Sequence, residues 1–156
     1  MDDVKIIINK KSVDDYLLYY FVKYPKRKKP PITKPIPPSL NDWMIMPRFK
    51  MNSQKQIWKE FGIWLIKENN LENMKINKCE ITIEYFFKDK RKRDSDNYTP
   101  KNLFDSFVIS GLLIDDDFGH VESLTLKGNY SKEDPRMEIT FSEIKLLGDE
   151  DGTTNI

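Results

Sequence analysis

Two groups of aspartates carry the residue types best suited to chemistry in this sequence. The first is the run Arg93-Asp94-Ser95-Asp96-Asn97, and the second is Asp115-Asp116-Asp117, with an expected helix between them. Carboxylates about 4 Å apart repel by roughly 1 to 4 kcal/mol at surface-like dielectrics, so a converged cluster implies a bound cation. Oxygen ligands without a nearby His or Cys favour Mg²⁺, Mn²⁺ or Ca²⁺. The alternative is that both groups are solvated acidic turns next to the helix.

Other kinds of site fit these residues less well. An EF-hand loop starting at Asp94 would put Thr99 where glycine is required and Asp105, not Glu, at the twelfth position. An aspartyl phosphotransferase usually has its Asp-x-Asp directly after a buried strand, whereas basic residues intervene here. The single Cys79 and single His120 exclude an internal disulfide and a His/Cys zinc site, and His120 is interpreted as a polar loop residue.

The charge of the chain is divided sharply along the sequence. The net charge is +1, but residues 1–93 carry 21 basic and 11 acidic side chains, whereas residues 94–156 carry 5 and 14. A cationic part next to an anionic part suggests a surface for a polyanion beside a pocket for a cation, which suits metal-assisted chemistry on nucleic acid. The alternative is that the two parts neutralise one another across the fold.

Hydrophobic periodicity predicts the elements that must position these residues. The expected strands cover residues 6–8, 79–87, 121–127 and 137–144, the last two separated by a turn through 128–135. One expected helix covers residues 13–22 and another covers residues 100–110. A third begins after a cap at Asn52 or Ser53, has its apolar positions between Ile57 and Leu65, and ends at Asn69-Asn70. Residues 39–50 are expected to be irregular, and six prolines in residues 24–38 predict an extended connector.

The helix between the two aspartate groups has the clearest local signals. Thr99 is a good N-cap, and Pro100 suits the first helical position. Leu103 and Phe107 belong to one apolar stripe, and Gly111 stands where a left-handed C-terminal residue belongs. The two acidic groups meet only if the chain after Gly111 turns back along this helix.

Length and order of elements together indicate the fold class. A chain of 156 residues is expected to form one domain. We predict an α+β fold: a small single domain with a mixed sheet and helices packed on it. No apolar run approaches the ~20 residues of a membrane span, and no signal peptide is recognised, so we expect a soluble cytoplasmic protein with no membrane partner.

One combined pattern runs through both aspartate groups and the helix between them. It consists of Arg93-Asp94-Ser95-Asp96-Asn97, Lys101, Phe104-Asp105, Gly111, Asp115-Asp116 and a strand that ends near Glu138-Ile139. Together these residues resemble the RusA family of Holliday-junction resolvases, small metal-dependent endonucleases common in prophages. Pro37-Pro38-Ser39-Leu40-Asn41 and the helix containing Trp58 look like the family's N-terminal half, so the resemblance covers about Pro35 to Ile144.

The resemblance implies a RusA-like α+β homodimer that binds four-way DNA junctions and makes paired, Mg²⁺-dependent nicks, with Mn²⁺ as a substitute. The implied catalytic residues are Asp94, Asp96, Asp116 and Lys101. The implied metal ligands are Asp94, Asp96 and Asp116, with Asp115 second to Asp116. The basic residues next to them, Lys90, Arg91, Lys92 and Arg93, are expected to contact DNA.

The sequence departs from the family pattern in three places. Pro100 makes the spacing from Asp96 to Lys101 one residue longer, and three consecutive aspartates leave the third acidic ligand open. Residues 1–34 have no recognised counterpart and are interpreted as an N-terminal extension and connector, followed by the nuclease domain (35–147) and a disordered acidic tail (148–156).

Two other functions compete with a resolvase. One is a nucleic-acid-binding protein without catalysis, which would use Lys26–Lys29 and Lys88–Arg93 on phosphates. The other is an interaction protein whose basic, proline-rich segment docks onto a partner. Phosphodiester hydrolysis itself needs no histidine, because Mg²⁺ retains water and substrate oxygens and takes few protein ligands.

Overall fold

The computed structural model describes residues 3–98 and 100–145. The strands are β1 (Val4–Ile8), β2 (Cys79–Phe87), β3 (Val121–Tyr130) and β4 (Arg136–Glu143). The helices are α1 (Lys10–Lys23), α2 (Leu40–Met44), α3 (Arg48–Glu68) and α4 (Lys101–Ile109), with the short 3-10 turn η1 (Ser95–Asn97) before α4. No helix of the described residues is both long enough and apolar enough to cross a membrane.

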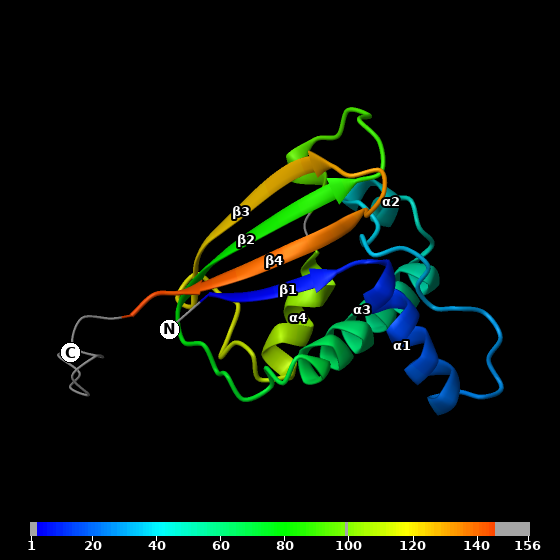
Figure 1. Ribbon diagram of the computed structural model, residues 1–156, viewed down its shortest axis with the longest axis horizontal. Helices are drawn as coiled ribbons and strands as arrows, with labels where there is room; N and C mark the ends of the chain where they lie inside the picture. Colours follow the sequence, from blue (N-terminus) through cyan, green and yellow to red (C-terminus); the bar gives the residue numbers. More distant parts are fainter. Residues whose placement is uncertain (1–2, 99, 146–156) are drawn as a thin grey trace.

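The four strands form one mixed sheet in the order β1-β4-β2-β3. β4 is antiparallel to both of its neighbours, whereas β2 and β3 are parallel and are joined by a crossover that contains α4. Helices α1, α3 and α4 lie on one face of this sheet (Figure 1). The prediction of a small single α+β domain with helices packed on a mixed sheet is therefore confirmed.

Alternation along β2 separates the buried and the open face of the sheet. Cys79, Ile81 and Ile83 are fully buried and Tyr85 is nearly so, while the intervening residues point to the other face. This is the period-2 pattern predicted for a strand with one wet face. Within the core, the ring of Phe107 from α4 packs edge-on against Phe141 of β4, with 5.3 Å between ring centroids. α4 is thereby held against the middle of the sheet.

Residues 4–34 are part of this sheet and of the same core. β1 pairs with β4 from Val4 opposite Phe141 to Ile8 opposite Met137. Asn9 and Ser12 form a reciprocal capping box that starts α1 directly after the strand. The buried side chains from residues 4–34 are Ile6, Ile8, Val13, Tyr16, Tyr20 and Ile32. Residues 4–34, which belong to the segment interpreted from the sequence as an extension and connector, therefore supply an edge strand and a share of the core.

Three local predictions are corrected. α3 begins at Arg48 rather than after a cap at Asn52 or Ser53, which lie inside the helix. The stretch expected to be irregular contains α2, capped by the Ser39 hydroxyl, which accepts from the backbone N–H of Asp42 at 3.2 Å. The turn before β4 comes later than expected, because β3 pairs with β2 along its full length and runs through 128–130. The expected tail, 148–156, lies outside the described residues.

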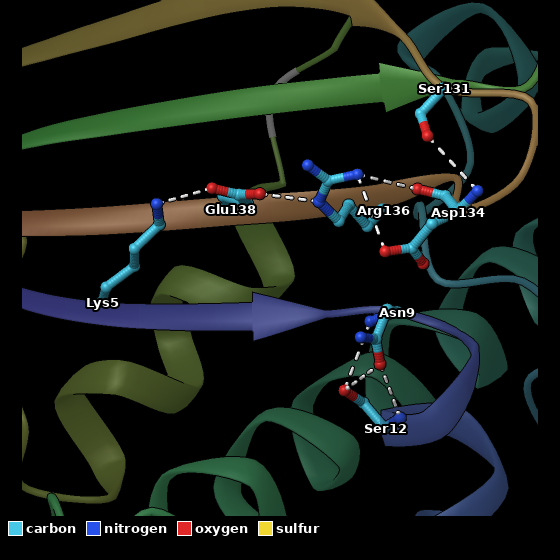
Figure 2. A network of polar contacts seen from close by, with 7 residues as sticks. All are labelled: Lys5, Asn9, Ser12, Ser131, Asp134, Arg136 and Glu138. Atoms are coloured by element: carbon cyan, nitrogen blue, oxygen red, sulfur yellow. Dashed lines mark hydrogen bonds and ion pairs between the residues drawn. The ribbon is translucent and has the colours of Figure 1, made fainter.

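The open face carries a chain of ion pairs that runs from β1 to the first residue of β4 and to Asp134 just before it (Figure 2). Glu138 is only 9% exposed. Its carboxylate lies 2.6 Å from Lys5 Nζ and 2.6 Å from Arg136 Nε, and these two cations hold its pKa below the ordinary value. Arg136 also covers the ring of Phe86, 3.7 Å from the ring centroid. These contacts tie β1, β4 and β2 together on the side away from the helices.

Candidate functional site

The first aspartate group forms an exposed turn just after β2. Asp94 precedes η1, and Asp96 lies within it; both side chains are exposed. Two long-range hydrogen bonds hold the turn. The amide oxygen of Asn97 accepts from the backbone N–H of Asn41 at 2.9 Å, and the Tyr85 hydroxyl donates to the Tyr98 carbonyl at 3.0 Å. The aspartates are therefore displayed on a short turn that is anchored at its C-terminal end.

The bond between Asn97 and Asn41 joins two segments that the sequence singled out separately. Asn41 lies in the first turn of α2, within the Pro37–Asn41 stretch, and is 56 residues from Asn97. The side chain of Asn97 therefore connects the turn to α2.

The basic residues next to the turn are partly engaged with a neighbouring acid. Asp89 accepts from Arg91 at 3.0 Å and from Arg93 at 2.8 Å, and these hydrogen bonds hold the pKa of Asp89 well below its usual range. Arg93 also stacks 4.2 Å from the ring centroid of Phe87. Of the four residues expected to contact DNA, Lys90 and Lys92 therefore keep exposed ammonium groups, whereas the two guanidinium groups are paired.

The two arginines do not engage the carboxylates of the turn. Within residues 3–98 and 100–145, neither Asp94 nor Asp96 makes a side-chain hydrogen bond or an ion pair. Both face water beside a positively charged loop. The exposed Asp-x-Asp therefore keeps its two carboxylates, while the neighbouring Arg91 and Arg93 are hydrogen-bonded to Asp89.

Lys101 stands at the first residue of α4, one turn before Asp105, and both side chains are exposed. Pro100 lies just before the helix rather than in its first position, and Thr99, expected to cap it, is outside the described residues. The opposite face of α4 is fixed by close packing on α3: a Cβ added at Gly62 would lie 2.0 Å from Ser106 Oγ. This packing directs Lys101 and Asp105 away from the core.

The chain after α4 is turned by a glycine, as predicted. Gly111 has φ +90°. The backbone N–H of Leu112 donates to the Phe107 carbonyl at 3.0 Å, which is the hydrogen bond of a Schellman motif that spans six residues. The next residues bond to the segment before β2: Lys75 N–H donates to the Gly111 carbonyl, and Ile76 N–H to that of Leu112, both at 2.9 Å. The second aspartate group is therefore carried toward the start of β2.

The second aspartate group lies in the loop between α4 and β3, close to His120 and to Asp105. Asp115, Asp117 and His120 form the one group of three potential metal ligands found in the described parts of the chain, with ligand atoms within 4.8 Å of one another. The Asp117 carboxylate bonds the His120 ring, which lowers the pKa of Asp117. Partial burial, followed by the charges of Asp115 and Asp105, raises the pKa of Asp116.

The structure anchors the two aspartate groups at different ends of β2. The His120 carbonyl accepts from Cys79, the first residue of the strand, whereas Tyr98 is bonded to Tyr85, its seventh. Six residues of a strand span about 20 Å. Asp94 and Asp96 therefore do not join Asp115–Asp117 in one cluster of ligands within the described residues.

Two features of this region were not anticipated. Asp105 contributes to the electrostatics of Asp116, and His120 contacts Asp117. The spacing Asp117-x-x-His120 is the signal that points to the second contact, because a tight turn brings residues three apart together. No comparable signal links Asp105 to Asp116, since their proximity depends on the path of the chain after Gly111.

Comparison with known proteins adds no further assignment. No protein-family model matches this chain, and no curated protein is significantly similar to it. The functional argument therefore rests on the residues of the turn, the loop and α4.

Proposed function

We propose that this protein is a metal-dependent endodeoxyribonuclease that resolves four-way DNA junctions by paired phosphodiester hydrolysis, as the RusA-like pattern implies. One observation carries the proposal. Asp94 and Asp96 are exposed on an anchored turn and have no side-chain partner among residues 3–98 and 100–145, while Asp89 engages the neighbouring arginines. We infer a cytoplasmic protein that acts in DNA recombination.

The residues of the turn suit a hard cation. Mg²⁺ is usually bound through one or two carboxylates, with water and substrate phosphate completing its octahedral shell, so Asp94 and Asp96 are sufficient protein ligands. When bound, Mg²⁺ supplies an activated water and stabilises the leaving oxygen of the phosphodiester. Lys101, exposed at the start of the next helix, contacts the scissile phosphate or orients the water. Lys90 and Lys92 hold the DNA backbone beside the turn.

Asp116 is the third acidic residue of the proposed site. Its pKa is raised by partial burial and by Asp115 and Asp105, which is the electrostatic setting that a cation relieves. Because Asp116 does not share a ligand cluster with Asp94 and Asp96 among the described residues, its contribution to cleavage has to be tested separately from theirs.

The decisive experiment is cleavage of a synthetic four-way junction in Mg²⁺, with a linear duplex and a single strand as controls. Asp94→Asn and Asp96→Asn are expected to abolish cleavage while junction binding is kept or strengthened, because each removes a metal ligand and a charge that repels phosphate. Asp14→Asn, which changes an exposed aspartate on α1, is the matched control and is expected to cleave normally. Undiminished cleavage by both turn variants would refute the proposal.

Resolution requires two nicks related by symmetry, so we propose a two-fold homodimer. A mixed dimer of wild type and Asp96→Asn is expected to nick one strand of a supercoiled cruciform and to produce an open circle. Two active subunits are expected to produce a linear product. Linear product from the mixed dimer at the wild-type rate would contradict paired sites.

The second candidate is a nucleic-acid-binding protein without catalysis. The separation of the two aspartate groups along β2 favours it, because neither group alone contains all the expected acidic ligands. The same cleavage assay decides between the two functions. Salt-dependent junction binding without any Mg²⁺- or Mn²⁺-dependent nicking would support the binding protein.

A further inference from the structure

A groove of about 770 Å³ lies beside the Asp94–Asn97 turn. It is bounded by the proline-rich segment 31–38, the junction between α2 and α3, and the end of β2. Figure 1 places α2 next to the end of β2, where these segments meet. Arg93 and Tyr98, on either side of the turn in sequence, both line the groove. Groove and turn are therefore contiguous.

The charge of the lining is strongly one-sided. Four cationic side chains, Lys34, Lys50, Lys88 and Arg93, line the groove, against the single acidic side chain of Asp42. The three lysines are exposed, and within the described ranges 3–98 and 100–145 none of them belongs to an ion pair. Unpaired cations from three separate segments that face one hollow attract a polyanion.

The remaining lining includes apolar and aromatic side chains, and Arg93 already lies over the ring of Phe87. Phe87 and Tyr98 pack edge to face in it, with 5.1 Å between ring centroids. The prolines that line the groove are Pro31, Pro35, Pro37, Pro38, Pro47 and Pro135. Aromatic rings beside a positively charged groove are the combination that proteins use to bind unpaired nucleic-acid strands, because bases stack and phosphates pair with lysine.

We propose that this groove binds an unpaired strand of DNA and leads it to the Asp94–Asn97 turn. A volume of about 770 Å³ is that of a cube about 9 Å on a side. A DNA duplex is wider than its own major groove of about 12 Å and is therefore too wide for this hollow, whereas a single strand can enter it. Two parts of this proposal rest on the proposed function: that the strand is DNA, and that it continues to the Asp94–Asn97 turn. Its phosphates lie on Lys34, Lys50 and Lys88.

The test is equilibrium binding of a fluorescein-labelled 12-mer of thymidine, measured by anisotropy without Mg²⁺ over a range of salt concentrations. The groove variant is Lys34→Gln/Lys50→Gln. The control variant, Lys67→Gln/Lys127→Gln, removes two exposed lysines that lie outside the groove. Circular dichroism of each variant verifies the fold.

Each phosphate contact to a single strand contributes about 0.7 to the slope of log K against log salt. Loss of two contacts is therefore expected to lower the slope by about 1.4 and to weaken binding about 25-fold at 0.1 M salt. The control variant is expected to keep the wild-type slope. Asp42→Asn, which removes the acidic side chain of the lining, is expected to bind more tightly than wild type.

Several results would overturn the groove assignment. These are no binding of the 12-mer by wild type, equal losses in the groove and control variants, or a groove variant that loses duplex binding as strongly as single-strand binding. A matched uridine 12-mer tests whether the strand is DNA or RNA. Because no metal or cleavage is involved, failure of junction cleavage leaves this outcome unchanged, and the two proposals fail separately.

Discussion

The role of β1 in the core yields the sharpest test of the fold. Ile6 and Ile8 are fully buried in the helix-facing side of the sheet, whereas Ile7, between them, points to the open face and is 44% exposed. Ile6→Ala removes buried methyl and methylene groups and leaves a cavity, so we expect a loss of about 2 to 5 kcal/mol in the free energy of unfolding. Ile7→Ala has the same chemistry at an exposed position and is expected to cost less than about 1 kcal/mol.

The measurement is urea and thermal unfolding followed by circular dichroism. For a domain of this size, 1 kcal/mol corresponds to about 2 to 4 °C, so Ile6→Ala is expected to lower the melting temperature by about 4 to 20 °C. Equal effects of Ile6→Ala and Ile7→Ala would refute the placement of β1 in the sheet.

The same reasoning applies to removal of residues 1–34. Truncation to 35–156 takes away β1, α1 and six buried side chains, each worth about 1.5 to 3 kcal/mol of apolar burial. Their sum, about 9 to 18 kcal/mol, is as large as the whole stability of an ordinary domain. We expect the fragment to lack a cooperative unfolding transition; a fragment that unfolds cooperatively and binds junctions would show that residues 1–34 are dispensable.

Three further predictions concern packing and charge. Gly62→Ala is expected to cost about 1 to 3 kcal/mol, because its Cβ would lie 2.0 Å from Ser106 Oγ; adding Ser106→Gly should recover part of the loss in urea unfolding. Glu138→Gln is expected to lower the free energy of unfolding by about 1.5 to 3 kcal/mol at pH 7, because it removes the charge that pairs with Lys5 and Arg136. Since the folded pKa of Glu138 is lowered, this difference should persist above about pH 4.3 and shrink as pH falls through the folded value; an unchanged difference at pH 2 would contradict it. The pKa of Asp116 is raised instead, so Asp116→Asn should increase the melting temperature at pH 7, and the gain should vanish below about pH 4. A lower melting temperature for Asp116→Asn at pH 7 would show that its charge is stabilising.

Local sequence patterns predicted β2 and the end of α4, because the signals for both lie within a few residues of the chain. β2 has the predicted limits, Cys79 to Phe87, because alternation of apolar and polar side chains is a property of the strand itself. The left-handed Gly111 after α4 was equally readable, since the conformation favours glycine wherever it occurs. The start of α3 was misplaced by about one and a half turns, because α3 has no side-chain cap that would mark it.

Pairing between distant segments was not readable in the same way. β1 has five residues, and its partner β4 begins 128 residues after β1 ends. An edge strand of this length has no separate sequence signal that identifies its partner, and its stability comes from burial against helices elsewhere in the chain. The sequence pattern therefore led us to interpret residues 1–34 as an extension. In the structure, residues 4–34 supply β1, α1 and part of the core.

The sequence by itself determined the chemistry on offer: an Asp-x-Asp turn, a basic loop, a lysine at the start of a helix and a run of three aspartates. Only the tertiary structure decided which of these meet. The Asn97–Asn41 bond brings the turn to α2 and the groove, while the backbone bonds after Gly111 direct the second aspartate group to the start of β2. The physical reason is that side-chain chemistry is local, whereas the position of each group follows from backbone bonds and packing between segments far apart in the chain.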